Sequence, residues 1–221
     1  MEKVIKLLVK YYPVYLSGLW GTLWISAVTV LLGGVLGMLV ALMRMSRSRV
    51  LKAISGVYIE VLRGTPILLQ LYFFWIGLPK LVPFELTDTQ CIVAALAVNA
   101  SAFISEIIRA GISAVDKGQW EAARSIGLSE THVMTHVILP QAVKNILPAI
   151  ANEFVVIIKE SAITYTIGVQ DIMSAVQQVK GATFVIIEPL LVATAIYFCL
   201  CFPTSKVIAY FERRMSRGDK R

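Results

Sequence analysis

Six ionisable side chains lie inside strongly apolar stretches of the chain: Glu60, Arg63, Glu106, Arg109, Glu153 and Glu160. At the centre of a membrane helix, one such charge costs about 2.5–3.5 kcal/mol on insertion scales, so it needs a partner or a function. Three residues separate Glu60 from Arg63, a spacing at which helical side chains meet. Glu106 and Arg109 repeat this spacing, and we expect both pairs to be structural ion pairs.

Glu153 and Glu160 have no arginine at helical spacing, although Lys159 adjoins Glu160. Seven residues separate the two carboxylates, which therefore project from nearly the same side of a helix. Because an intramembrane charge marks a functional site by default, we expect this pair to lie on a substrate path. Two carboxylates that face such a path would favour a cationic substrate by charge complementarity.

His132 and His136 are four residues apart, a spacing that can chelate zinc on a helix. No third ligand is evident nearby, and the His-Glu-x-x-His signature is missing because Val133 follows His132. We therefore expect a solvated helix face and no metal site. The sequence also offers no constellation of nucleophile, base and metal, so we expect no catalytic residue and no membrane enzyme.

Phosphate-binding loops are also absent from the sequence. It contains neither Gly-x-Gly-x-x-Gly nor Gly-x-x-x-x-Gly-Lys-Ser/Thr. We expect no cofactor in this chain, and any ATP and magnesium that the protein uses must be bound by a partner.

The elements that position these residues are expected to be membrane helices. Hydrophobic residues make up 57% of the chain and charged residues 16%, whereas about a quarter of residues are charged in soluble domains. The net charge of +7 comes from basic residues beside apolar segments, not from a basic groove interleaved with aromatic residues. We therefore expect an all-α, multi-pass membrane protein that does not bind nucleic acid.

Five membrane spans are expected within a transmembrane domain of residues 18–210. Their predicted bounds are about 19–43, 54–78, 89–111, 142–159 and 189–205. Pro66 removes a helical hydrogen bond, so the second span should be broken or kinked there, with Thr65 satisfying freed backbone groups. An amphipathic interfacial segment, residues 1–17, precedes the first span, and a basic tail, residues 211–221, follows the last.

The distribution of lysine and arginine predicts the orientation of these spans. Basic residues gather in the loop after the first span, between the third and fourth spans (Lys117, Arg124 and Lys144) and in the tail. By the positive-inside rule, these parts are cytoplasmic and the N-terminus is outside. Residues 161–188 are then an outer segment of moderate polarity, in which we expect one short helix and loops.

Residues 112–141, the polar segment, separate two strongly apolar blocks and cannot lie in lipid. Gly127 is a natural C-terminal stop for a helix, and Ser129 is a natural N-cap. We therefore expect two short helices, over residues 117–126 and 130–139.

The polar segment carries a distinctive order of residues: Glu121-Ala122-Ala123, then Gly127, then Ile138-Leu139-Pro140. This order resembles the EAA loop of the permeases of ATP-binding cassette (ABC) importers. In that family, the loop supplies a coupling helix that docks in a groove of the cytoplasmic ATPase subunit. The resemblance assigns this docking to Glu121, Ala122, Ala123, Arg124, Gly127 and Leu128.

Further stretches resemble the polar amino acid uptake branch of this family: residues 60–70, 105–112, 140–142, 152–161 and 211–214. One departure is Lys159-Glu160-Ser161-Ala162, where many similar members carry Lys-Asp-Thr/Ser-Ser-Leu. This departure bears on the substrate and not on the family.

The resemblance implies a type I ABC importer permease of five helices in the cytoplasmic membrane of a prokaryote. Its expected partners are two ATPase subunits, a second permease of the same or a similar kind, an extracytoplasmic binding protein and membrane lipid. The expected substrate is a polar amino acid, and Glu153 with Glu160 would favour arginine, lysine or histidine. Asn99 and Ser101 are the expected partners of its α-amino or α-carboxylate group.

A proton-coupled secondary transporter is the alternative. In such a carrier, Glu106 or Glu153 would carry protons. Many of these carriers are built from inverted repeats, and the sequence shows none.

Overall fold

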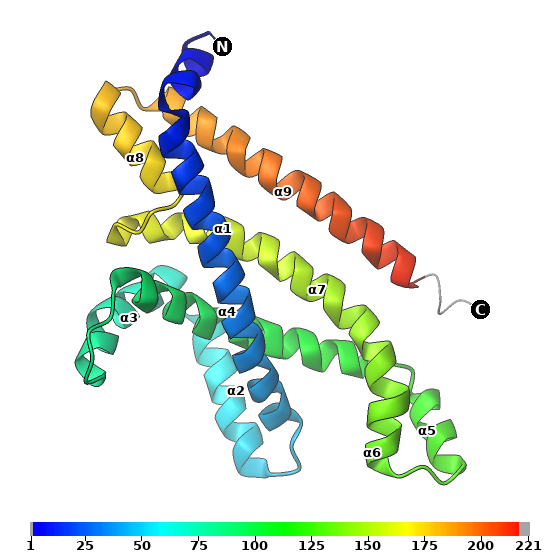
Figure 1. Cartoon of the computed structure of the whole chain (residues 1–221). Coiled ribbons are helices and arrows are strands. Elements are labelled where there is room, and N and C mark those ends of the chain that lie inside the picture. The colour runs from blue at the N-terminus through cyan, green and yellow to red at the C-terminus, as the bar shows by residue number, and fades with distance from the viewer. Residues whose placement is uncertain (1, 217–221) are drawn as a thin grey trace.

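The computed structural model describes residues 2–216, and every regular element in that range is a helix (Figure 1). Basic residues Arg217, Lys220 and Arg221 of the predicted tail lie outside the described range. The longest helix, α1 (Glu2–Met45), has 44 residues and is about 66 Å long at 1.5 Å per residue. Non-helical angles at Tyr11, just before Pro13, kink it. The predicted interfacial segment is thus helical and continuous with the first span.

The second predicted span is broken, as Pro66 indicates. Helix α2 (Arg49–Gly64) meets α3 (Ile67–Leu81) at an angle of 109°. The Thr65 hydroxyl donates a hydrogen bond to the carbonyl oxygen of Val61 at 2.8 Å. This bond supplies a partner for a backbone group that the break leaves free, so the prediction for Thr65 and Pro66 is confirmed.

Helix α4 (Asp88–Ser113) forms the centre of the molecule. A capping box on Thr87 starts it, and it packs against α1, α2, α3 and α7. Close approach to α7 (Leu139–Glu160) occurs at Gly111, where a Cβ atom would lie 2.4 Å from Cγ1 of Ile146. The contact fixes the point at which these two helices cross.

Within residues 2–216, three helices, α1, α4 and α9 (Ile187–Ser216), are long and apolar enough to cross a membrane, and the broken α2–α3 pair makes a fourth candidate. Helix α7 is not among these candidates. The fifth span and the orientation of the chain stay predictions.

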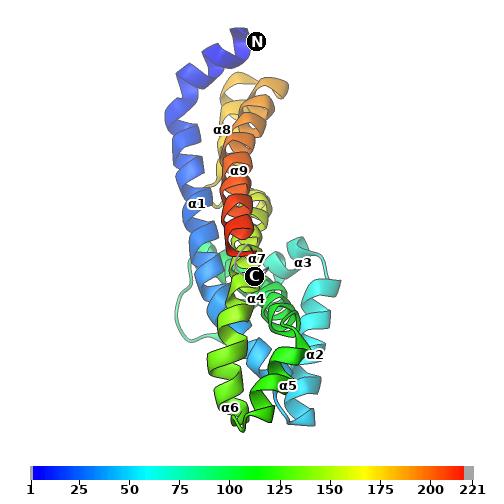
Figure 2. The ribbon, with the colours of Figure 1, turned by 90° about the vertical axis from the view of Figure 1, so that its right-hand side faces the viewer.

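Residues 161–188 contain a 3₁₀ helix, η2 (Ser161–Ile167), and the short helix α8 (Ile172–Thr183). Buried Asp171 caps α8, which packs on the N-terminal half of α1 and on α9. Figure 2 places α8 and the polar segment at opposite ends of the molecule. Helix α8, in the segment that we expect outside the membrane, thus lies far from the polar segment that we expect in the cytoplasm.

Candidate functional site

The polar segment folds as a helical hairpin at one end of the molecule (Figures 1 and 2). Its first helix, α5 (Lys117–Ser125), is followed by Gly127 with a φ of 86°, a left-handed conformation that glycine adopts without strain. Ser129 then caps α6 (Glu130–His132) through its hydroxyl oxygen, which accepts from the amide of His132. The stop at Gly127 and the cap at Ser129 are as predicted.

The second helix of the hairpin does not end at residue 139, so that prediction is wrong. Helix α6 continues through a π turn, η1 (Val133–Ile138), directly into α7. In this wide turn the amide of Leu139 donates to the carbonyl of Met134, five residues back. Because Pro140 cannot donate and its ring crowds the carbonyl four residues before it, a wider turn carries the helix past the proline.

The exposed surface of this hairpin differs from the expected one. Ala123 is buried and packs with Val133 and Ile138, so it holds the hairpin together. The other expected docking residues are exposed or half-buried: Glu121, Ala122, Arg124, Gly127 and Leu128. Ile126 is 78% exposed and was missed, although an apolar residue directly before the Gly127 turn is a signal for an exposed contact.

Charged groups connect the hairpin to the loop after α1. Glu130 forms ion pairs with Arg47 and with Arg124, the latter at 3.8 Å. His132 and His136 stack with ring centroids 5.2 Å apart on an exposed face. Among residues 2–216, no group of three potential ligands is arranged to hold a metal.

Of the two expected ion pairs, one is present. Arg109 binds Glu106 through Nη2 at 2.8 Å and through Nε. Glu60 and Arg63 form no such pair within residues 2–216, because the Arg63 guanidinium lies over the ring of Phe103 on α4, 5.3 Å from its centroid. The expectation for Glu60 and Arg63 is therefore corrected.

Asn99 and Ser101 are buried and already have partners in the chain. The Asn99 amide donates to Oε1 of Gln70 at 2.9 Å and to the carbonyl of Leu62, beside the α2–α3 break. Ser101 donates to the carbonyl of Val98 and shares a 2.7 Å hydrogen bond with the Tyr58 hydroxyl. The Asn99 contacts brace the α2–α3 break, and the role of Asn99 and Ser101 toward a substrate stays a prediction.

Glu153 and Glu160 are both half-buried on α7. They are close enough for the charge of Glu160 to act on Glu153. Two carboxylates in this arrangement repel one another, and a bound cation would relieve the repulsion.

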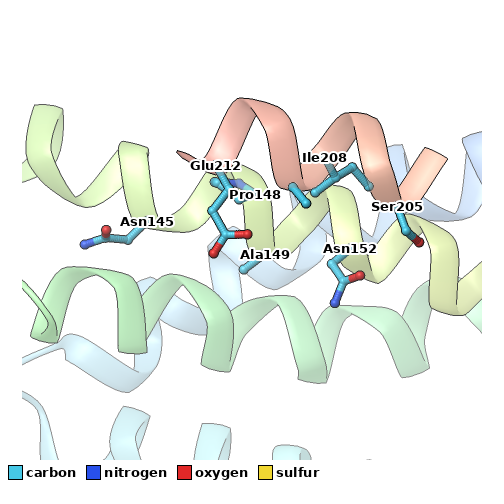
Figure 3. Close-up of a pocket in the computed structure, with 8 residues that line it drawn as sticks. Asn145, Pro148, Ala149, Asn152, Ser205, Ile208 and Glu212 are labelled. Carbon is cyan, nitrogen blue, oxygen red and sulfur yellow. The ribbon is translucent and has the colours of Figure 1, made fainter. Parts of the chain in front are cut away.

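A groove of about 330 Å³ with both polar and apolar lining residues lies between α7 and α9 (Figure 3). Asn145 and Asn152 line it from α7, and Glu212 reaches toward them from α9. The two asparagines are seven residues apart, the same spacing as Glu153 and Glu160, and this repeat is a signal that the sequence reasoning missed. Helix α7 thus presents two adjacent polar stripes.

Comparison with known proteins identifies the family of this chain. Residues 33–217 match the family model described as "Binding-protein-dependent transport system inner membrane component". The arginine transport system permease protein ArtQ of Bacillus subtilis is 42% identical over 94% of each chain. A putative glutamine transport system permease protein GlnP of Rickettsia typhi is 36% identical over 96% of this chain and 99% of the relative.

Two solved structures of ABC transporters contain chains that resemble this one. The chain is 45% identical, with a TM-score of 0.89, to a chain in the crystal structure of an amino acid ABC transporter with histidines, and the match covers 94% of this chain and 96% of that one. A methionine ABC transporter, MetNI, shares the fold at 19% identity and a TM-score of 0.68. Family and apolar helices together describe a multi-pass component of the cytoplasmic membrane that takes part in amino-acid transport. The chain belongs to the binding-protein-dependent transport system inner membrane components and is a polar amino acid ABC transporter permease.

Proposed function

We propose that this chain is the permease subunit of an ATP-driven importer that moves a basic amino acid across the membrane by alternating access. The observation that carries the proposal is the continuity of α6, η1 and α7. This continuous helix joins the exposed polar hairpin to the face that bears Glu153 and Glu160. A movement imposed on the hairpin would therefore reach the carboxylates without crossing a flexible loop.

In this proposal the hairpin docks on an ATPase subunit, and two such subunits serve a pair of permeases. Glu121 and Arg124 supply polar contacts, Ala122 permits close approach, and Gly127 provides the turn that presents Ile126 and Leu128. ATP binding would close the ATPase dimer and open the spans outward, and hydrolysis would reverse the change. ATP and magnesium would be held by the ATPase alone.

The basic substrate is inferred from charge. The charge of neighbouring Lys159 acts on Glu160, whereas Glu153 has no arginine at helical spacing and is repelled by Glu160, so a cationic side chain would be attracted to Glu153. One relative is an arginine permease by name, and the related structure contains histidines, which supports this choice. An extracytoplasmic binding protein would deliver the amino acid.

Reconstitution tests the proposal. The chain is co-expressed with an ABC ATPase subunit, co-purified, and placed in liposomes with arginine, lysine, glutamine or glutamate. We expect co-purification and ATP hydrolysis that arginine or lysine stimulates most. Uptake that persists without the ATPase and follows a proton gradient would instead show the secondary transporter.

A further inference from the structure

Both histidines of the chain lie together on the hairpin, and the proposed function uses neither. His132 and His136 are the only histidines in the sequence, and both are exposed. His132 ends α6 and His136 lies within η1, so the pair spans the junction of these two elements. Imidazole nitrogens suit zinc and its neighbours among the transition metals, and two histidines on successive turns of one helix face can bind zinc.

The separation of the two imidazole rings fits a shared metal ion. Their centroids are 5.2 Å apart, and their planes differ by 14°. Two imidazoles that bind one tetrahedral zinc ion, with Zn–N bonds of about 2.0–2.1 Å, have ring centroids about 5 Å apart. Both side chains are exposed, so no packing opposes the small rotation that would bring both Nε2 atoms onto one ion.

Neighbouring hydroxyl groups contact Nδ1 of both rings. The Thr135 hydroxyl donates to the carbonyl oxygen of Thr131 at 2.8 Å, so its oxygen is left to accept from Nδ1–H of His136, also at 2.8 Å. The unprotonated Nε2 of His136 is then available to a metal. Ser129 Oγ lies 3.1 Å from Nδ1 of His132 and can accept from it in the same way. Outer partners of this kind orient metal-binding histidines and set which nitrogen binds.

Water must supply the remaining ligands of such an ion. Within residues 2–216, no third histidine, cysteine or carboxylate joins the pair to form a metal-binding group. Glu130, two residues before His132, is held in ion pairs by Arg47 and Arg124. Zinc sites with open positions fill them with water. The pair would therefore bind an ion reversibly, and more weakly than a closed structural site with four protein ligands.

We propose that His132 and His136 bind a zinc ion that clamps the junction between the hairpin and α7. The ion would fix the distance between the end of α6 and η1, the π turn through which α6 continues into α7. Metal binding does not depend on the proposed function. Its effect on transport rests on that function, because the movement of the hairpin is proposed to pass through this turn.

Calorimetric titration of the detergent-purified permease with zinc chloride tests the site. The protein carries a purification tag without histidine and lacks Cys91, Cys199 and Cys201, since thiolates also bind zinc. We expect one ion per chain. His132→Ala and His136→Ala should each lower the affinity about tenfold or more, because even loss of an outer partner costs about 10–100-fold. Binding that survives both variants, or no binding by the parent protein, overturns the site.

Thr135 offers a matched pair of variants. Thr135→Val removes the oxygen that accepts from Nδ1–H of His136, and we expect zinc binding to weaken about tenfold. Thr135→Ser keeps a hydroxyl at this position and should bind within about twofold of the parent protein. Equal affinity of the two variants would remove Thr135 from the site as the residue that orients His136.

Hydrogen exchange shows whether the ion clamps the turn. An opening that separates the two histidines releases the ion, so zinc at about 100 times its dissociation constant should slow exchange of the amides of residues 133–139 up to about hundredfold. The amides of α8, at the opposite end of the molecule, are the control and should exchange equally with and without zinc. Unchanged exchange in residues 133–139 of protein that binds zinc overturns the clamp.

Transport in proteoliposomes with the ATPase tests the effect of the clamp on coupling. Zinc should raise the arginine imported per ATP hydrolysed about twofold, because less of the hairpin's movement is lost in bending the π turn. His132→Ala should show no such rise. An equal ratio with and without zinc, in protein whose turn is protected, overturns the effect on coupling. Absence of ATP-driven uptake in either condition would instead refute the proposed function, while the titration and the exchange still decide the zinc site.

Discussion

Gly21 of α1 lies directly against the backbone of Gln170, so a Cβ atom at Gly21 would be 2.0 Å from the Gln170 carbonyl oxygen. This contact joins α1 to residues 161–188 at the end of the molecule opposite the hairpin. A backbone carbonyl in a capped loop cannot move aside as the end of a flexible side chain can.

We expect Gly21→Ala to destabilise the protein by about 1–3 kcal/mol, because one added methyl group overpacks this contact. Thermal unfolding of the detergent-purified permease measures the effect. Gly34→Ala, also on α1, is the control, since no atom lies within 4 Å of its added Cβ. Equal stability of the two variants would contradict the close contact at Gly21.

Ile126 should be a major contact with the ATPase. Burial of an isoleucine contributes about 1.5–3 kcal/mol, so we expect Ile126→Ser to weaken ATPase binding about tenfold or more. Affinity between the purified subunits, measured in detergent, checks this. Phe184→Ser changes an apolar residue at the other end that is even more exposed, at 90%, and should leave the affinity unchanged. Unchanged affinity for the Ile126 variant would remove Ile126 from the docking surface.

Glu153→Gln and Glu160→Gln should change substrate preference. Each removes one negative charge from the shared face of α7, so we expect arginine uptake to fall about tenfold while glutamine uptake stays within about threefold. Competition between the two amino acids in proteoliposomes measures the ratio. Glu85→Gln, in the loop between α3 and α4, is the control. Parallel loss of both substrates would assign the carboxylates a structural role.

Asp171 should make stability depend on pH. Burial raises the pKa of its carboxyl from 3.8 to about 6, despite hydrogen bonds from the amides of Met173 and Ser174. The folded state then holds a proton that the unfolded state releases. This stabilisation is complete below about pH 4 and is lost as the pH rises through about 6.

Asp171→Asn tests this dependence, because the amide oxygen can still cap α8 but does not titrate. Relative to this variant, the free energy of unfolding of the wild type should fall by up to about 3 kcal/mol between pH 4 and pH 7. Unfolding temperatures across this range measure the difference. Parallel curves for the two proteins would show that Asp171 keeps the same pKa on folding.

Much of the fold follows from local rules in the sequence. Pro66 breaks a helix because it lacks an amide proton, and Gly127 stops one because it adopts a positive φ without strain. Both are properties of single residues and their immediate neighbours. The apolar length of α1, α4 and α9 is equally local.

The remaining features depend on parts of the chain that are distant in sequence. Arg63 is drawn away from Glu60 by Phe103, forty residues further along on α4. The side-chain amide of Asn99 donates to the carbonyl of Leu62, and this carbonyl is free only because helix α2 ends shortly after Leu62. Helical spacing cannot reveal such competition, because it counts neighbours on one helix and not those that another helix supplies.

The crossing of α4 and α7 has a mechanical consequence. Ile146, held against Gly111, lies close to the midpoint between Glu130 in the hairpin and Glu160 at the far end of α7. A stiff rod fixed near its middle acts as a lever with a fulcrum. A sideways displacement of Glu130 would then move Glu160 in the opposite direction, with the π turn and Pro148, which removes a backbone hydrogen bond inside α7, as the compliant points of the rod. Distances between spin labels at the two ends, measured with and without ATP, would reveal such a see-saw.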